Sequence, residues 1–100
     1  MTDAPPRRIR LPWYSREDYP RIRDMMSDRH TLAPTYDGWL AAAENNEAVG
    51  LQAGLQIIRI MIGPDAFAQW CKEKGLEPDS AARTRYAAEM SGTVAPTAKP

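Results

Sequence analysis

The chain has 100 residues, with 13 basic and 13 acidic side chains and a formal net charge of zero. This length predicts one small domain, and the charge balance argues against a surface built to bind a polyanion. The single cysteine excludes an intrachain disulfide, and the longest apolar run is too short to cross a bilayer. Because the first residues also lack the apolar segment of a signal peptide, we expect a cytoplasmic protein.

The first predicted element is a strand near the start of the chain. Residues 1–6 contain two prolines and no apolar pattern, which indicates a flexible N-terminal arm. Residues 8–13 alternate apolar and polar side chains, which predicts a strand with Trp13 on its apolar face. Pro12 cannot donate a hydrogen bond within a sheet, so we expect this strand at a sheet edge.

Two helices are expected next, over residues 16–26 and 36–53. The first has a proline where its second turn would lie, so its first turn could begin later than residue 16. Thr35 is placed to cap the second helix, and Gly54 is placed to end it. Gly50 lies four residues before Gly54, and this spacing indicates a fraying helix end.

The second predicted strand, residues 55–62, is the most informative segment of the chain. On an extended chain Ile58, Ile60 and Ile62 lie on one face, and further aliphatic side chains lie on the other. A strand that is apolar on both faces has to be covered on both. We therefore expect an inner strand that pairs with residues 8–13 and is shielded by helices or by a second copy of the chain.

Two more helices complete the predicted fold, over residues 64–74 and 80–90. The first begins with proline at its first position, and Gly75 closes it in a Schellman motif. Residues 92–100 contain two prolines and predict a flexible tail. The resulting fold class is α+β in the order β-α-α-β-α-α. It forms one domain over residues 7–91, with a two-stranded ribbon packed by four short helices.

Several segments of the chain resemble a small uncharacterised bacterial protein family. They are DAFAQWC at residues 65–71, GLEPD at residues 75–79, and YDGWL at residues 36–40. The resemblance covers roughly residues 12–90. Because aromatic and turn residues carry it, it implies a fold and a bacterial cytosolic setting, and it implies no particular activity.

Cys71 and His30 are the candidate nucleophile and base, with Asp28 or Asp37 to orient the imidazole. Cys71 lies beside an aromatic residue in a predicted helix, which is the usual place of a small buried hydrophobe. His30 lies in a polar loop, where a single imidazole has no spacing typical of metal ligands. We therefore expect no enzymatic activity, no cofactor and no metal.

Adjacent or nearby carboxylates form two further candidate groups for acid and base chemistry. These are Glu17 with Asp18, and Glu44 with Glu47. Neither pair lies beside an apolar segment that would raise a carboxyl pKa, so both are interpreted as charges on helix surfaces.

Arg7, Arg8 and Arg10 stand beside Trp13 and Tyr14, the one place where basic and aromatic residues alternate. This pattern is a candidate nucleic-acid contact. The alternative interpretation is an edge strand whose arginines discourage unwanted pairing. With a net charge of zero, we do not expect nucleic acid to be the partner.

The leading functional hypothesis is a small non-enzymatic protein-interaction or regulatory module. Its partner would be another protein or a second copy, with self-association through the strand around Ile58. The candidate interface comprises Ile58, Ile60, Ile62 and Trp13. The alternatives are a nucleic-acid-binding accessory protein that uses the N-terminal arginines and a thiol-dependent enzyme at Cys71.

Overall fold

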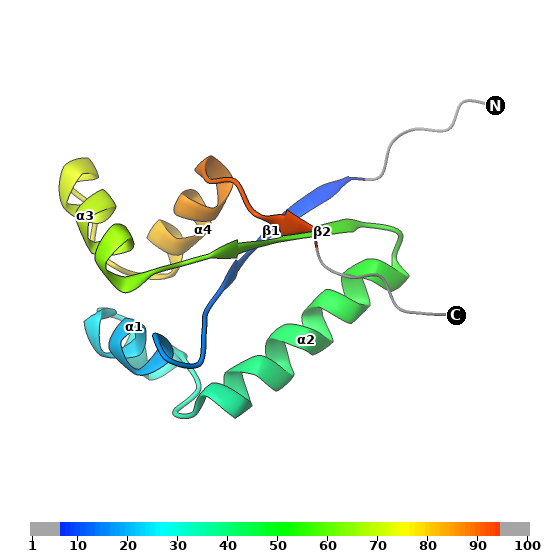
Figure 1. Cartoon of the computed structure of the whole chain (residues 1–100), viewed down its shortest axis with the longest axis horizontal. Coiled ribbons are helices and arrows are strands. Elements are labelled where there is room, and N and C mark those ends of the chain that lie inside the picture. The colour runs from blue at the N-terminus through cyan, green and yellow to red at the C-terminus, as the bar shows by residue number, and fades with distance from the viewer. Residues whose placement is uncertain (1–6, 95–100) are drawn as a thin grey trace.

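The computed structural model describes residues 7–94 and confirms the α+β fold with its predicted order of elements (Figure 1). The elements are β1 (Arg8–Trp13), α1 (Tyr19–Met25), the 3-10 turn η1 (Arg29–Thr31), α2 (Tyr36–Gln52), β2 (Gln56–Met61), α3 (Pro64–Lys74), α4 (Ser80–Glu89) and β3 (Thr93–Val94). The predicted arm and the last six residues of the predicted tail lie outside the described residues. Among residues 7–94, no helix is both long enough and apolar enough to cross a membrane.

The sheet has three strands in the order β1-β2-β3, where two were expected. β1 and β2 run parallel, and β3 pairs antiparallel with β2 at Ile58 and Arg59. A Cβ atom on Gly92 would overlap the carbonyl oxygen of Arg59, so glycine is needed where the chain returns to β2. β2 is thus the inner strand, and β3 occupies the edge at Ile58 through which self-pairing was expected.

One face of β2 forms the main core of the molecule. Ile58 is 8% exposed, and Ile60 and Ile62 are fully buried. The side chains packed with them come from β1, α1, α3, α4 and the residues around them: Tyr14, Tyr19, Ile22, Met26, Phe67, Trp70, Cys71, Ala82, Tyr86 and Ala87. In Figure 1, α3 and α4 lie on one side of the strands and α2 lies on the other.

The opposite face of β2 packs against α2. Ile57 is 2% exposed, and its Cδ1 atom would lie 2.8 Å from a Cβ on Gly50. Gly50 therefore lets α2 approach β2 closely, and the interpretation of this residue as part of a fraying end is wrong. Helices of the same chain thus cover both faces of β2, as predicted, except at Met61, which lies on the face of Ile57 and is 55% exposed.

The helix caps explain most of the observed boundaries. Thr35 accepts a hydrogen bond from the amide of Gly38 at 3.1 Å, and Gly54 has the left-handed φ of 87° expected of a terminator. α1 begins at Tyr19 instead of residue 16, because the amide of Asp18 bonds the hydroxyl of Ser15 in a preceding turn. Its proline then lies within the first turn, where no amide donor is needed.

Candidate functional site

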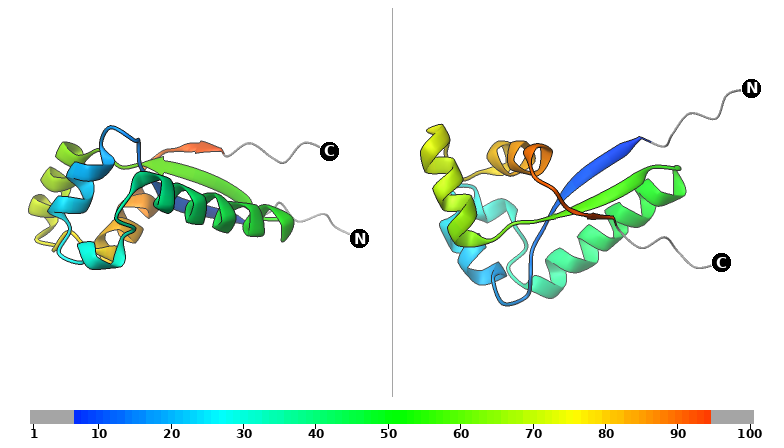
Figure 2. Two further views of the ribbon diagram at one scale, coloured as in Figure 1. Left: turned by 90° about the horizontal axis from the view of Figure 1, so that it is seen from below. Right: turned by 45° about the horizontal axis from the view of Figure 1, so that its top comes forward.

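A groove of about 290 Å³ lies along β1, between α2 and α4. Its floor is the C-terminal half of β1 with the residue that follows, and its walls are mainly small or uncharged side chains. The lining residues are Leu11, Pro12, Trp13 and Tyr14 on the floor, Trp39, Ala42, Ala43 and Asn46 on α2, and Ser80, Arg83 and Thr84 on α4. The right view of Figure 2 shows β1 between these two helices.

The outer edge of β1 has no strand partner among residues 7–94. At the two ends of the strand, the carbonyl of Arg7 accepts from Gln56 at 2.8 Å and that of Trp13 accepts from Ile62 at 2.9 Å. The register between them is unbroken, so every second residue from Arg7 bonds β2 and the residues between turn their backbone groups outward. Pro12 is one of the outward residues, which confirms its predicted place at an edge.

Aromatic side chains pack against one another at the floor of the groove. The ring of Trp39 lies 5.2 Å from that of Trp13 and 4.8 Å from that of Tyr14, between ring centroids. Tyr36 donates a hydrogen bond from its hydroxyl to the carbonyl of Tyr14 at 3.2 Å. Burial raises the pKa of Tyr14 to about 12, so its phenol is neutral at physiological pH.

A bidentate ion pair supports Trp13 from the α2 side. Arg59 donates from Nε and Nη2 to the two carboxylate oxygens of Glu47, at 2.7 Å each. The guanidinium carbon of Arg59 also lies 4.2 Å from the ring centroid of Trp13. Glu47 is 6% exposed, so its interpretation as a charge on a helix surface is wrong. Its position three residues before Gly50, on the same helix face, was the available signal.

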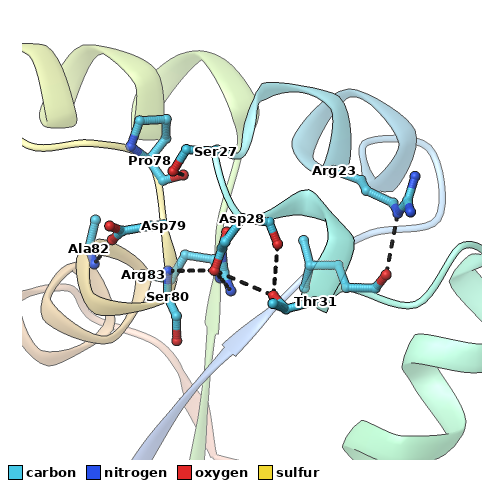
Figure 3. Close-up of polar contacts among 10 residues, drawn as sticks. Arg23, Ser27, Asp28, Thr31, Pro78, Asp79, Ser80, Ala82 and Arg83 are labelled. Atoms are coloured by element: carbon cyan, nitrogen blue, oxygen red, sulfur yellow. Dashed lines mark hydrogen bonds and ion pairs between the residues drawn. The ribbon is translucent and has the colours of Figure 1, made fainter.

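A second ion pair joins Arg83, which lines the groove from α4, to Asp28 (Figure 3). Arg83 is 6% exposed and donates to Asp28 at 2.9 and 3.3 Å, and the amide of Ser80 donates to the same carboxylate at 3.0 Å. The hydrogen bond from Arg83 lowers the pKa of Asp28, and the charge of Arg83 acts in the same direction. The pair ties the loop that contains η1 to α4.

The residues predicted as an interface belong to the interior instead. Ile58, Ile60, Ile62 and Trp13 are all buried within the single chain. The three isoleucines are therefore not available to a partner in this fold, whereas Trp13 lines the floor of the groove. Their apolar pattern indicated burial correctly, but the helices of the chain itself supply the cover.

The structure does not assemble the candidate thiol site. Cys71 is 4% exposed, and its burial raises the pKa of the thiol, with the charge of Asp79 adding to the effect. His30 is exposed on η1. Asp28 binds Arg83 as described above, and Asp37 binds Arg16 at 2.7 Å, so arginines engage both carboxylates proposed to orient the imidazole.

The N-terminal arginines are exposed, but the aromatic residues beside them are not. Arg7, Arg8 and Arg10 face solvent, and Arg10 donates to the carbonyl of Met90 at 2.5 Å. Trp13 and Tyr14 are 5% and 2% exposed. The arginines therefore lie at an open sheet edge without an aromatic surface on which bases could stack.

The polar groups that line the groove come from few side chains. Besides the polar atoms of its aromatic residues, they belong to Asn46, Ser80 and Thr84, and to Arg83, whose charge is balanced by Asp28. Within residues 7–94, no group of three or more histidine, cysteine, aspartate or glutamate side chains is arranged to hold a metal ion.

The chain was compared with known protein families, curated proteins and solved structures. A family model described as a domain of unknown function, DUF8829, matches residues 14–98. The groove walls on α2 and α4 lie within the matched stretch, and β1 precedes it. No match was found among curated proteins or among solved structures.

Proposed function

The chain belongs to the DUF8829 family, a domain of unknown function, and we propose from its geometry that it is a small non-enzymatic protein-interaction module. Its partner docks in the groove along the outer edge of β1. The observation that carries this proposal is an unpaired strand edge at the floor of an aromatic groove. An open edge offers a row of backbone donors and acceptors to another chain, and natural proteins usually protect such edges.

The partner is a different protein and not a second copy. Arg8 and Arg10 are both outward residues of β1, separated by Ile9. Two copies joined along β1 in a symmetric antiparallel pair would therefore place arginines of one copy against arginines of the other. Like charges directly opposite each other destabilise a strand pair. This repulsion supports the interpretation of the arginines as a guard against self-pairing.

The two alternative functions have weaker support. A nucleic-acid-binding role lacks stacking aromatics beside Arg8 and Arg10, and the chain has no net positive charge. A thiol-dependent role requires a reactive thiolate, and burial around Cys71 disfavours that form. The single cysteine supports a setting in a reducing cytoplasm.

Two matched variants of α2 test the proposed docking site. Ala42→Arg places a long charged side chain in the groove, whereas Ala48→Arg places the same side chain on an exposed part of the same helix outside the groove lining. Tagged wild-type protein, A42R and A48R are each used to capture partners from the native cell. We expect a protein retained by the wild type and by A48R to be lost from A42R.

The folded state of both variants is checked first by circular dichroism and thermal melting. If a protein binds the wild type, A48R and a correctly folded A42R equally, the groove is not the docking site and the proposed function is wrong in its central feature.

A further inference from the structure

We propose that an extended acidic segment of another protein lies in the groove and continues along the outer edge of β1 past Arg10 and Arg8, which lie beyond the groove lining. The segment pairs with β1 as an additional strand of the sheet. This inference rests on the proposed function and specifies the chemistry of its partner. Backbone groups of β1 would give the affinity, and its alternating side chains would select the segment.

The backbone of β1 defines where such a segment pairs. The outward residues are Arg8, Arg10 and Pro12, because the residues between them bond β2. The N–H and C=O groups of Arg8 and Arg10 have no hydrogen-bond partner among residues 7–94, so both residues can pair with an incoming strand. Pro12 offers only its carbonyl, so pairing is complete at the arginines and weakens at the proline.

The side chains of β1 define what the segment contains. Arg8 and Arg10 lie on one face of the strand, and Ile9 and Leu11 lie on the other. A residue directly opposite on an added strand shares the face of its neighbour. The favoured segment therefore alternates carboxylate and apolar residues, with the carboxylates beside the arginines.

No acidic residue of the groove competes for this partner. None of the residues that line the groove is an aspartate or glutamate, and the α2 and α4 walls present Asn46, Ser80 and Thr84. Arg83 is balanced by Asp28, whereas among the side chains described, those of residues 7–92, Arg8 has no hydrogen-bond or ion-pair partner, and Arg10 donates to a backbone carbonyl. Within the described part of the chain, the positive charge at this edge therefore has no counter-charge, and it is complementary to carboxylates.

Two short synthetic peptides test the inference. One alternates glutamate and valine, and the matched peptide has lysine in place of every glutamate. Binding is measured by fluorescence anisotropy at low and moderate salt, and backbone amides are followed by NMR. We expect the glutamate peptide to bind about tenfold more tightly than the lysine peptide, with a difference that shrinks as salt is raised.

The amide signals show whether the peptide adds as a strand. On binding the glutamate peptide, the amides of Arg8 and Arg10 should shift and become protected from exchange. Arg8→Glu should weaken binding of the glutamate peptide by about fivefold and strengthen binding of the lysine peptide. Arg29→Glu makes the same change of charge on the exposed turn η1 and should change neither affinity.

Equal affinity for the two peptides, or binding without protection of Arg8 and Arg10, would overturn the inference. Tighter binding of a short single-stranded RNA at the same amides would overturn it as well. These outcomes differ from failure of the proposed function: if A42R still loses its partner while the acidic peptide does not bind, docking in the groove stands and the acidic strand is wrong.

Discussion

At the scale of single residues, the ion pair of Glu47 with Arg59 links α2 to the inner strand and to the groove floor. Both carboxylate oxygens of Glu47 accept hydrogen bonds, and the guanidinium lies over Trp13. Removing one member of such a pair leaves the other without its partner in a poorly solvated place. Removing Glu47 should therefore lower the free energy of unfolding more than removing an exposed carboxylate.

Glu47→Gln tests this pair. The amide keeps the size of the side chain and loses its charge, so we expect the free energy of unfolding to fall by about 1–3 kcal/mol. Urea denaturation monitored by tryptophan fluorescence measures the change. Glu44→Gln is the control, because Glu44 is exposed on the same helix and should change stability by less than about 0.5 kcal/mol. Equal effects of the two substitutions would show that the pair contributes no specific stability.

The ion pair of Asp28 with Arg83 predicts how stability depends on pH. Arg83 lowers the pKa of Asp28 in the folded state. The Asp28 carboxylate therefore stays ionised in the folded protein at pH values where the same carboxylate takes up a proton in the unfolded chain. The contribution of this ion pair to the free energy of unfolding is complete at neutral pH, and it declines as the pH falls below about 4, the ordinary pKa of aspartate. We expect Asp28→Asn to be less stable than the wild type at pH 7 and to lose less stability on acidification. Urea titrations at a series of pH values measure this, and parallel curves for the two proteins would contradict it.

The contacts of individual charged residues were harder to predict from the sequence than the helices and strands. The burial of Ile58 and Cys71 followed from local apolar patterns. The partner of Glu47 is twelve residues away on another element, and no spacing rule connects the two. The same holds for Asp28 and Arg83, which the fold brings together across 55 positions of sequence. Pairs of this kind depend on tertiary packing, which local patterns do not contain.

At the scale of elements, local chemistry determines most boundaries. α3 ends at Lys74, the φ of the following Gly75 is 67°, and the amide of Leu76 donates to the carbonyl of Cys71 at 2.9 Å. The predicted Schellman motif is confirmed, because proline at the start of a helix and glycine after its end act over a few residues. Strand β3 was missed, since a two-residue strand has no alternating pattern to detect.

Gly75→Ala tests the cap of α3. A Cβ atom at this residue has no neighbour within 4 Å, so the only penalty is the left-handed backbone. We expect the free energy of unfolding to fall by about 1 kcal/mol, and Gly75→Asn to lose less because asparagine tolerates this conformation. Thermal melting of the two variants measures the difference. Equal losses for alanine and asparagine would assign the effect to something other than backbone conformation.

At the scale of the whole molecule, one chain covers both faces of its inner strand. α2 covers Ile57, and the core with α3 and α4 covers Ile60. The pattern of the sequence predicted the need for this cover, but it could not distinguish helices of the same chain from a second copy. The third strand and the open edge of β1 became visible only with the register of the sheet.

The internal cover predicts that the protein alone is a monomer. Helices of the same chain bury Ile57, Ile58 and Ile60 of β2 and leave only Met61 of its large apolar side chains exposed, at 55%, and arginines oppose pairing along β1. We expect light scattering at high protein concentration to give the mass of one chain. A mass of two chains that persists on dilution would contradict this expectation and would return self-association as the leading hypothesis.

Amide hydrogen exchange along β1 in the free protein tests the open edge most directly. Ile9 and Leu11 bond β2, and Arg8 and Arg10 turn outward, so protection should alternate along the strand. We expect slow exchange at Ile9 and Leu11 and fast exchange at Arg8 and Arg10. Slow exchange at all four amides would mean that the edge is already occupied, and it would contradict a docking site there.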